Sequence, residues 1–205
     1  MNISMGKLIL GSLLGGAVLF AWGMVSWMVL PWHNSTLTGF KNEDQFEEVL
    51  KIHAPEKGVY VFPGMCHFES NLSEAEKKAM MEKSYEKMEK GPYVFAVVSP
   101  NGSGSMTKCM IFGFIIQCLG AMLVTWLLSK TNFSCYMGRV IFTVVFGLGA
   151  GVVCFLPGWN WWGFPLNYTI VSMLDLIAGW FLAGLVLAKL TSSCCDEVCE
   201  MEKKA

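Results

Sequence analysis

An uncharged run near the start of the chain reads LILGSLLGGAVLFAWGMVSWMVL, from Leu8 to Leu30. No charged side chain occurs between Lys7 and Lys41. At a rise of about 1.5 Å per residue, a helix of this length crosses the roughly 30 Å hydrocarbon core of a bilayer. A cleaved signal peptide would have a shorter apolar core and a small-residue cleavage site. The run at residues 8–30 therefore predicts an uncleaved transmembrane helix.

Three further apolar runs predict three more transmembrane helices, at residues 110–128, 140–156 and 168–187. Each run is expected to be helical, because lipid offers the backbone no hydrogen-bond partners. The composition agrees with this interpretation. Of the 205 residues, 54% are hydrophobic and 15% are charged, and the mean hydropathy is +0.47. The expected fold class is a mainly α membrane protein with a bundle of four transmembrane helices.

Positive charges in the short segments predict the orientation of these helices. Lys7 precedes the first run, Lys130 and Arg139 bound the second loop, and Lys189 opens the C-terminal tail. Cytoplasmic segments are enriched in Lys and Arg. We therefore expect a multi-pass protein of the cell membrane with both termini in the cytoplasm. The net charge of −1 argues against nucleic acid as a partner. The expected surroundings of the four helices are the lipid bilayer.

Residues 31–109 predict a small outer α/β domain, on the periplasmic or extracellular side, inserted between the first two transmembrane helices. Asn42 and Ser73 are each followed three residues later by Gln or Glu, the pattern of a helix-capping box. Two Val-rich runs predict short strands. The helices are expected near residues 42–53 and 73–90, and the strands near residues 59–62 and 93–98. Because a two-stranded sheet is marginal alone, we expect this domain to lean on the membrane or a partner.

Tryptophans gather at the expected outer ends of the helices. Trp32 follows the first run, and Trp159, Trp161 and Trp162 lie in the uncharged third loop, residues 157–167. Indole rings favour the membrane–water interface. Anchoring at that interface is the expected role, and an aromatic ligand-binding box is the alternative.

Asp175 is the one acid within the predicted spans. It lies about 10 Å along its helix from the outer end, where a charge costs about 2.5–3.5 kcal/mol on insertion scales. We therefore expect Asp175 to face the bundle and to bond with Gln117, at the same depth in the second span, or with Ser26. A proton or ion relay is the alternative, but the other three spans carry no charged residue.

His33, His53, Cys66 and His67 are weak candidates for metal ligands, since imidazole and sulfur suit zinc or copper. Their spacing matches no standard metal motif, so neither a metal nor another cofactor is expected. Cys66 and Cys109 both fall on the expected outer side. A disulfide between them is expected only if that side is oxidising.

The tail at residues 191–205 is rich in cysteine and acidic residues, and it is expected in the cytoplasm. Cys194, Cys195 and Cys199 leave soft-metal binding and lipid attachment open, although an exposed tail is the simpler interpretation. Small-residue pairs, Gly11 with Gly15 and Gly147 with Gly151, favour close helix packing. Packing within one chain and dimerisation both remain open.

Three segments carry a resemblance to a known family: MVLPWHN at residues 28–34, GVYVFPG at 58–64 and WNWWGFP at 159–165. Together they resemble an uncharacterised family of bacterial inner-membrane proteins, which implies an inner-membrane location and no known activity. The layout of a large first loop is also similar to claudins, but their W-x-x-G-L-W-x-x-C-C signature is absent. Quinone-linked disulfide oxidoreductases need outer cysteine pairs, which this chain lacks.

Three functional hypotheses follow from the sequence. The leading one is a non-enzymatic accessory or scaffold subunit that binds another membrane protein or a second copy of itself, because no nucleophile–base set or nucleotide loop occurs. The alternative is a small oligomeric transporter or channel that uses Asp175. The second alternative is a metal-dependent or redox membrane enzyme that uses Cys66 and the nearby histidines.

Overall fold

The computed structural model describes residues 3–64, 73–133 and 135–191. These residues form two compact units. The helical unit comprises Met1–Thr38 and Ser105–Ala205, and the small unit comprises Gly39–Gly104. The small unit is shorter than the predicted domain at residues 31–109. The difference arises mainly because Trp32 and His33 bind back to the first helix.

Four long helices make up the described part of the helical unit: α1 (Met5–Met28), α4 (Met106–Lys130), α5 (Tyr136–Trp162) and α6 (Leu166–Leu190). Among the described residues, these are the helices that are long and apolar enough to cross a membrane. The last three helices contain their predicted runs, whereas α1 ends at Met28, two residues before the predicted end at residue 30. The predicted count of four long apolar helices is confirmed. A short 3-10 helix, η1 (Asn34–Thr36), follows α1.

Helix α5 corrects the prediction of a loop that begins at Pro157. A proline usually ends a helix because it lacks the backbone N–H, but α5 continues through Pro157 to Trp162. It ends at Gly163, whose φ of 70° and ψ of 22° are left-handed, a conformation that suits glycine. The N–H of Phe164 then donates to the carbonyl of Gly158 at 3.2 Å. Trp159, Trp161 and Trp162 thus lie in the last turns of α5 rather than in a loop.

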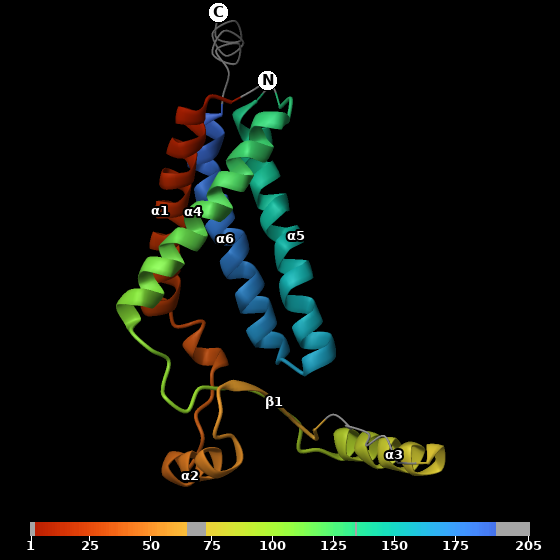
Figure 1. The fold of residues 1–205 in the computed structure, drawn as a ribbon. Helices are drawn as coiled ribbons and strands as arrows, with labels where there is room; N and C mark the ends of the chain where they lie inside the picture. Colours follow the sequence, from red (N-terminus) through yellow and green to blue (C-terminus); the bar gives the residue numbers. More distant parts are fainter. Residues whose placement is uncertain (1–2, 65–72, 134, 192–205) are drawn as a thin grey trace, which may run out of the picture. The chain divides into compact units, whose positions relative to one another are not determined.

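The long helices pack as two pairs, α1 with α4 and α5 with α6, and the pairs join mainly through α1 and α6 (Figure 1). Small residues bring the backbones together within each pair. A Cβ on Gly16 would lie 2.7 Å from Cα of Cys118 in α4, and one on Gly147 would lie 2.9 Å from Cβ of Trp180 in α6. Both predicted glycine pairs are used for packing inside the chain, since Gly11 and Gly15 also face α4.

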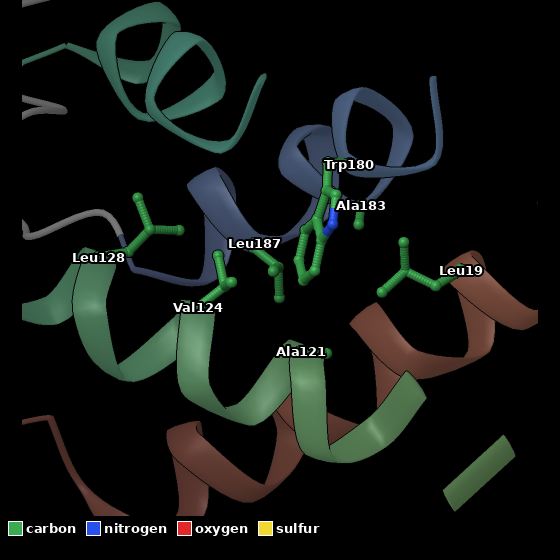
Figure 2. Close-up of a cluster of buried hydrophobic side chains, with 7 residues drawn as sticks. All are labelled: Leu19, Ala121, Val124, Leu128, Trp180, Ala183 and Leu187. Carbon is green, nitrogen blue, oxygen red and sulfur yellow. The ribbon is translucent and has the colours of Figure 1, made fainter. Parts of the chain in front are cut away.

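The apolar core lies toward the ends of α4 and α6, where α4 approaches α6. Figure 2 shows its buried side chains, which come from α1, α4 and α6. They are Leu19, Ala121, Val124, Leu128, Trp180, Ala183 and Leu187. The other half of the bundle contains the end of α1 and the start of α6. There, helix α4 diverges from α6 (Figure 1).

The small unit follows the predicted order of helix, strand, helix, strand, and that prediction is confirmed. Its elements are α2 (Glu43–His53), β1 (Gly58–Phe62), α3 (Glu74–Lys90) and β2 (Val94–Val98). Strands β1 and β2 pair antiparallel, with Gly58 opposite Val98 and Phe62 opposite Val94. Asn42 caps α2 by accepting from the N–H of Gln45 at 3.1 Å, and Ser73 forms a capping box with Glu76 on α3. Among the described residues of this unit, the buried apolar side chains are Ala54 and Val98.

A histidine–aspartate pair beside an open cleft

The segment after α1 folds back onto that helix. Trp32 donates its indole N–H to the carbonyl of Ser26 at 3.2 Å and lies 3.0 Å from the Ser26 hydroxyl. The Nε2 atom of His33 lies 3.1 Å from the same hydroxyl. Helix η1 supports this turn, because the Thr36 hydroxyl donates to the carbonyl of His33 at 2.8 Å. Ser26 therefore holds both Trp32 and His33 against the end of α1.

His33 is buried, with 1% of its surface exposed. Its ring stacks on Trp27, with the ring centres 3.8 Å apart and the planes 7° from parallel. The edge of Trp32 contacts it at a centroid distance of 5.6 Å. The sequence named His33 only as a weak candidate for a metal ligand, and the spacing of residues around it does not indicate this burial. Pro31 turns the chain, and the bonds to Ser26 draw the imidazole inward.

Asp175 lies next to this histidine. The distance from His33 Nε2 to Asp175 Oδ2 is 3.5 Å, and the Asp175 side chain is 19% exposed. Helix α6 is held there by Trp22 of α1, whose indole N–H donates to the carbonyl of Asp175 at 3.0 Å. Gly179, one turn further along α6, packs against Trp22 and Leu19. The approach of α1 to α6 thus sets the distance between the imidazole and the carboxyl group.

The expected hydrogen bond between Asp175 and Gln117 is absent from the described part of the chain. The physical reason is that α4 has diverged from α6 at this level, so Gln117 faces Asp175 only across a cleft that both residues line. Ser26, the other expected partner, reaches Asp175 through His33 instead. The Oδ1 atom of Asp175 and the Nδ1 atom of His33 are buried without a hydrogen-bond partner among the described residues.

The cleft has a volume of about 790 Å³. Residues of α1 form its floor, and residues of α4 and α6 form its walls. Its lining is mainly aromatic side chains, methionines and glycines, with few polar groups. The aromatic and methionine residues are Phe20, Trp22, Trp27, Trp180, Met24, Met28, Met106 and Met110, and the polar ones are Gln117, Cys109 and Asp175.

Ser26, His33 and Asp175 are the residue types of a hydrolytic triad, but their geometry differs from one. In a triad the serine and the acid contact opposite nitrogens of the imidazole, so that the acid orients the ring while the other nitrogen takes the serine proton. Here Ser26 and Asp175 both face Nε2 of His33. The arrangement suits the holding of charge beside a cleft better than the activation of a serine.

No protein-family model matches this chain, and no curated protein or solved structure is significantly similar to it. The resemblance to an uncharacterised bacterial family stays a prediction. The case for a function therefore rests on the pair of His33 and Asp175 and on the cleft beside it.

The other predicted site residues do not join this site. His53 ends α2 and is exposed, and it belongs to the small unit. Cys66 and His67 lie outside the described residues, as do Cys194, Cys195 and Cys199 of the tail. Within the described ranges, no three His, Cys, Asp or Glu side chains come together as a metal site. Cys109 is a free cysteine that lines the cleft, and its pairing with Cys66 stays a prediction.

The predicted interface tryptophans divide into two groups. Trp159 and Trp161 are 46% and 75% exposed, as expected of rings that contact the headgroup region of a bilayer. Trp32 instead turns inward to bond with Ser26. Sequence reasoning also missed Trp22 and Trp27, which line the cleft beside Asp175. The spacing carried a signal only for Trp22, because residues 22 and 26 are four apart and lie on one face of α1.

Proposed function

We propose that this protein is a small membrane transporter whose charged centre is the pair of Asp175 and His33. The observation that carries the proposal is the 3.5 Å approach of these two side chains at the edge of a cleft that Asp175 lines. Charged groups at membrane depth are costly, and they commonly mark pathways for substrates or ions.

The main argument from sequence against a transporter was that Asp175 stood alone. A relay or a coupled carrier needs more than one titratable group, and the predicted spans offered a single acid. His33 supplies the second group from outside the helices. An acid and a base in contact can exchange or share one proton, which a lone carboxylate cannot do. This contact moves the transporter ahead of the scaffold hypothesis.

The packing of the helices also supports a carrier. The pairs α1–α4 and α5–α6 each pack closely, whereas α4 makes few contacts with α5 or α6. Transporters expose a central site alternately to the two sides by moving one group of helices against another. Movement between the two pairs would act on the contact between α1 and α6, and that contact contains His33 and Asp175. An oligomer of such units is compatible with the same scheme.

An accessory or scaffold subunit is the second candidate, and the small unit favours it. Several large apolar side chains of α2 and the strands are exposed, including Ile52 and Val97 at 72% each. Exposed apolar groups on a unit with few buried ones are typical of a surface that binds a partner. The third hypothesis, a metal-dependent or redox enzyme, depends on Cys66 and His67, which lie outside the described residues.

Reconstitution into liposomes tests the transporter proposal. The liposomes contain a pH-sensitive dye and carry an imposed pH gradient. The panel of additives comprises inorganic cations, lipophilic cations and neutral amphiphiles. We expect at least one additive to change the internal pH in liposomes with the natural protein, and to have no such effect with Asp175→Asn. The amide keeps the size and the hydrogen bonding of the side chain but carries no charge.

Equal thermal stability of the two proteins is the control for folding. An absence of flux with every additive, from protein shown to be folded, contradicts the proposal. A stable membrane protein that co-purifies from native membranes, together with no flux, favours the scaffold candidate instead.

A further inference from the structure

We propose that the cleft binds lipophilic monovalent cations, with Asp175 as their counter-ion and tryptophan rings as their contact surface. The inference rests on the proposed function, because it names the substrate class of the same site. It follows from the charge, the lining and the size of the cleft.

The charge that the cleft presents to a ligand is negative. Among the described residues that line it, Asp175 carries the only charged side chain. The base that contacts Asp175, His33, lies behind Trp27 and is not part of the lining. The Oδ1 atom of Asp175 is buried and has no hydrogen-bond partner in the described chain, while the side chain as a whole keeps 19% of its surface exposed and lines the cleft. Attraction between opposite charges is strong where the dielectric constant is low, which favours cations and excludes anions.

The lining selects cations that are also apolar. Trp22, Trp27 and Trp180 border the cleft, and indole is the side chain whose face attracts cations best. Methionine side chains beside them are flexible and polarisable, so they adapt to ligands of different shape. The lining offers few oxygen ligands, whereas hard metal cations need six or more. A cation whose charge is spread over an organic body fits this surface better than a hydrated metal ion.

The size of the cleft points to a small molecule. Its volume of about 790 Å³ falls in the range of roughly 300–1,000 Å³ that is typical of sites for drug-sized ligands. A transmembrane helix of a partner is about 30 Å long and 10 Å across, which is much larger than this space. The occupant is therefore a compact cation rather than a helix from another protein.

Binding of radiolabelled tetraphenylphosphonium to the purified full-length protein in a neutral detergent tests the proposal. We expect saturable binding by the natural protein and at least about tenfold weaker binding by Asp175→Asn, because the loss of an ion pair in a low dielectric is large. Unlabelled triphenylphosphine oxide has a similar aromatic body and no net charge, and it should compete poorly. Trp27→Leu should weaken binding more than Trp27→Phe, which keeps an aromatic face.

A matched control is Gly149→Ala in α5. An added Cβ at Gly149 meets no atom within 4 Å, and Gly149 does not line the cleft. It should bind as the natural protein does. Unchanged affinity in a folded Asp175→Asn variant overturns the proposal, and so does competition by triphenylphosphine oxide as strong as that by unlabelled tetraphenylphosphonium.

A second arm separates a free cation from a lipid headgroup, since choline lipids carry a quaternary ammonium group. The same binding is measured in nanodiscs of phosphatidylethanolamine and in nanodiscs of phosphatidylcholine, because both lipids have no net charge and only the second carries a quaternary ammonium group. Equal binding in both supports a free cation, whereas loss in phosphatidylcholine shows that the headgroup occupies the cleft and overturns the proposal. Cation binding without flux contradicts only the transporter. Flux of another substrate by a protein that binds no lipophilic cation contradicts only the present inference.

Discussion

The imidazole Nε2 of His33 and the carboxylate Oδ2 of Asp175 lie 3.5 Å apart, which links the segment after the first long helix to the first half of the last one. Both side chains are largely buried. Ser26 fixes the histidine from one side, and Trp22 fixes the backbone of Asp175 from the other. The contact therefore belongs to the packing of α1 against α6 as well as to the cleft.

Substitutions of Asp175 separate its charge from its packing. Asp175→Asn keeps a group of the same size that can bond with His33, so the thermal midpoint should change little. Asp175→Leu leaves the imidazole without a polar partner and should destabilise the protein by about 1–2 kcal/mol, the upper range for bonds between membrane helices. The measurement is thermal unfolding in detergent. Equal midpoints for the two variants would show that the contact contributes nothing to stability.

Ser26→Ala should loosen the segment that follows α1. Ser26 is fully buried, and its hydroxyl contacts both Trp32 and His33. Loss of one buried partner costs about 1–3 kcal/mol, so hydrogen exchange at residues 31–36 should become faster. The control is Ser35→Ala in the same segment, since this serine is exposed and water can replace its hydroxyl. Unchanged exchange in Ser26→Ala would contradict the structure of this turn.

Two alanine substitutions in α1 test the close approach to α4. A Cβ on Gly16 would lie 2.7 Å from Cα and 2.9 Å from N of Cys118, whereas a Cβ on Gly23 meets nothing within 4 Å. Because the backbone of Cys118 cannot rotate away, Gly16→Ala should lower the thermal midpoint. Gly23→Ala should leave it equal or higher, since alanine favours helix. The reverse order of the two midpoints would rule out this packing of α1 on α4.

Reporter fusions test the predicted orientation. Fusions after Lys130 and at the C-terminus should report the cytoplasm, and a fusion between residues 100 and 105 should report the outside, because Lys and Arg mark cytoplasmic segments. The readout is a pair of reporters that are active on opposite sides of the membrane. An external C-terminus would be incompatible with four spans and a cytoplasmic N-terminus.

The capping box of α3 should respond to acid. Hydrogen bonds from the Ser73 hydroxyl and from the Ser73 N–H hold the pKa of Glu76 below its ordinary value of 4.5. A carboxyl with a lowered pKa in the folded state stabilises the helix fully above its unfolded pKa, and this stabilisation is lost as the pH falls through the folded pKa. The protection of amides at the start of α3, measured relative to exchange in the unfolded chain at the same pH, should therefore decrease below about pH 4.5. Ser73→Ala should remove most of this pH dependence. If the pH dependence persists in Ser73→Ala, another titrating group causes it.

Local patterns in the sequence predicted most of the elements. Capping residues such as Asn42 and Ser73 placed α2 and α3, because their side chains act on the next turn of the same segment. Apolar runs placed the four long helices for the same reason. Pro157 shows where a local rule fails, since α5 continues through it. The helix is long, and the loss of one backbone bond is small beside its remaining contacts.

The candidate site was predicted only in part, because its geometry depends on contacts between distant segments. Asp175 was recognised from its depth in an apolar run, but the same depth in Gln117 gave the wrong partner. Equal depth brings two residues together only when their helices touch, and α4 diverges from α6 at that level. The inward turn of His33 follows from three tertiary bonds around Ser26. No spacing rule in one sequence contains that information.

The cleft lies between α4 and α6 with α1 as its floor, and α5 contributes nothing to its lining. The lipophilic cations proposed as ligands partition into a bilayer, so on this proposal they reach the cleft from the lipid phase. Occupancy is then governed by the number of ligand molecules per lipid molecule, and the aqueous concentration matters only through partitioning. The total ligand concentration that gives half-maximal binding in small liposomes should therefore rise when the amount of lipid is doubled at constant protein. Titrations of this protein should accordingly be expressed as mole fractions in the membrane.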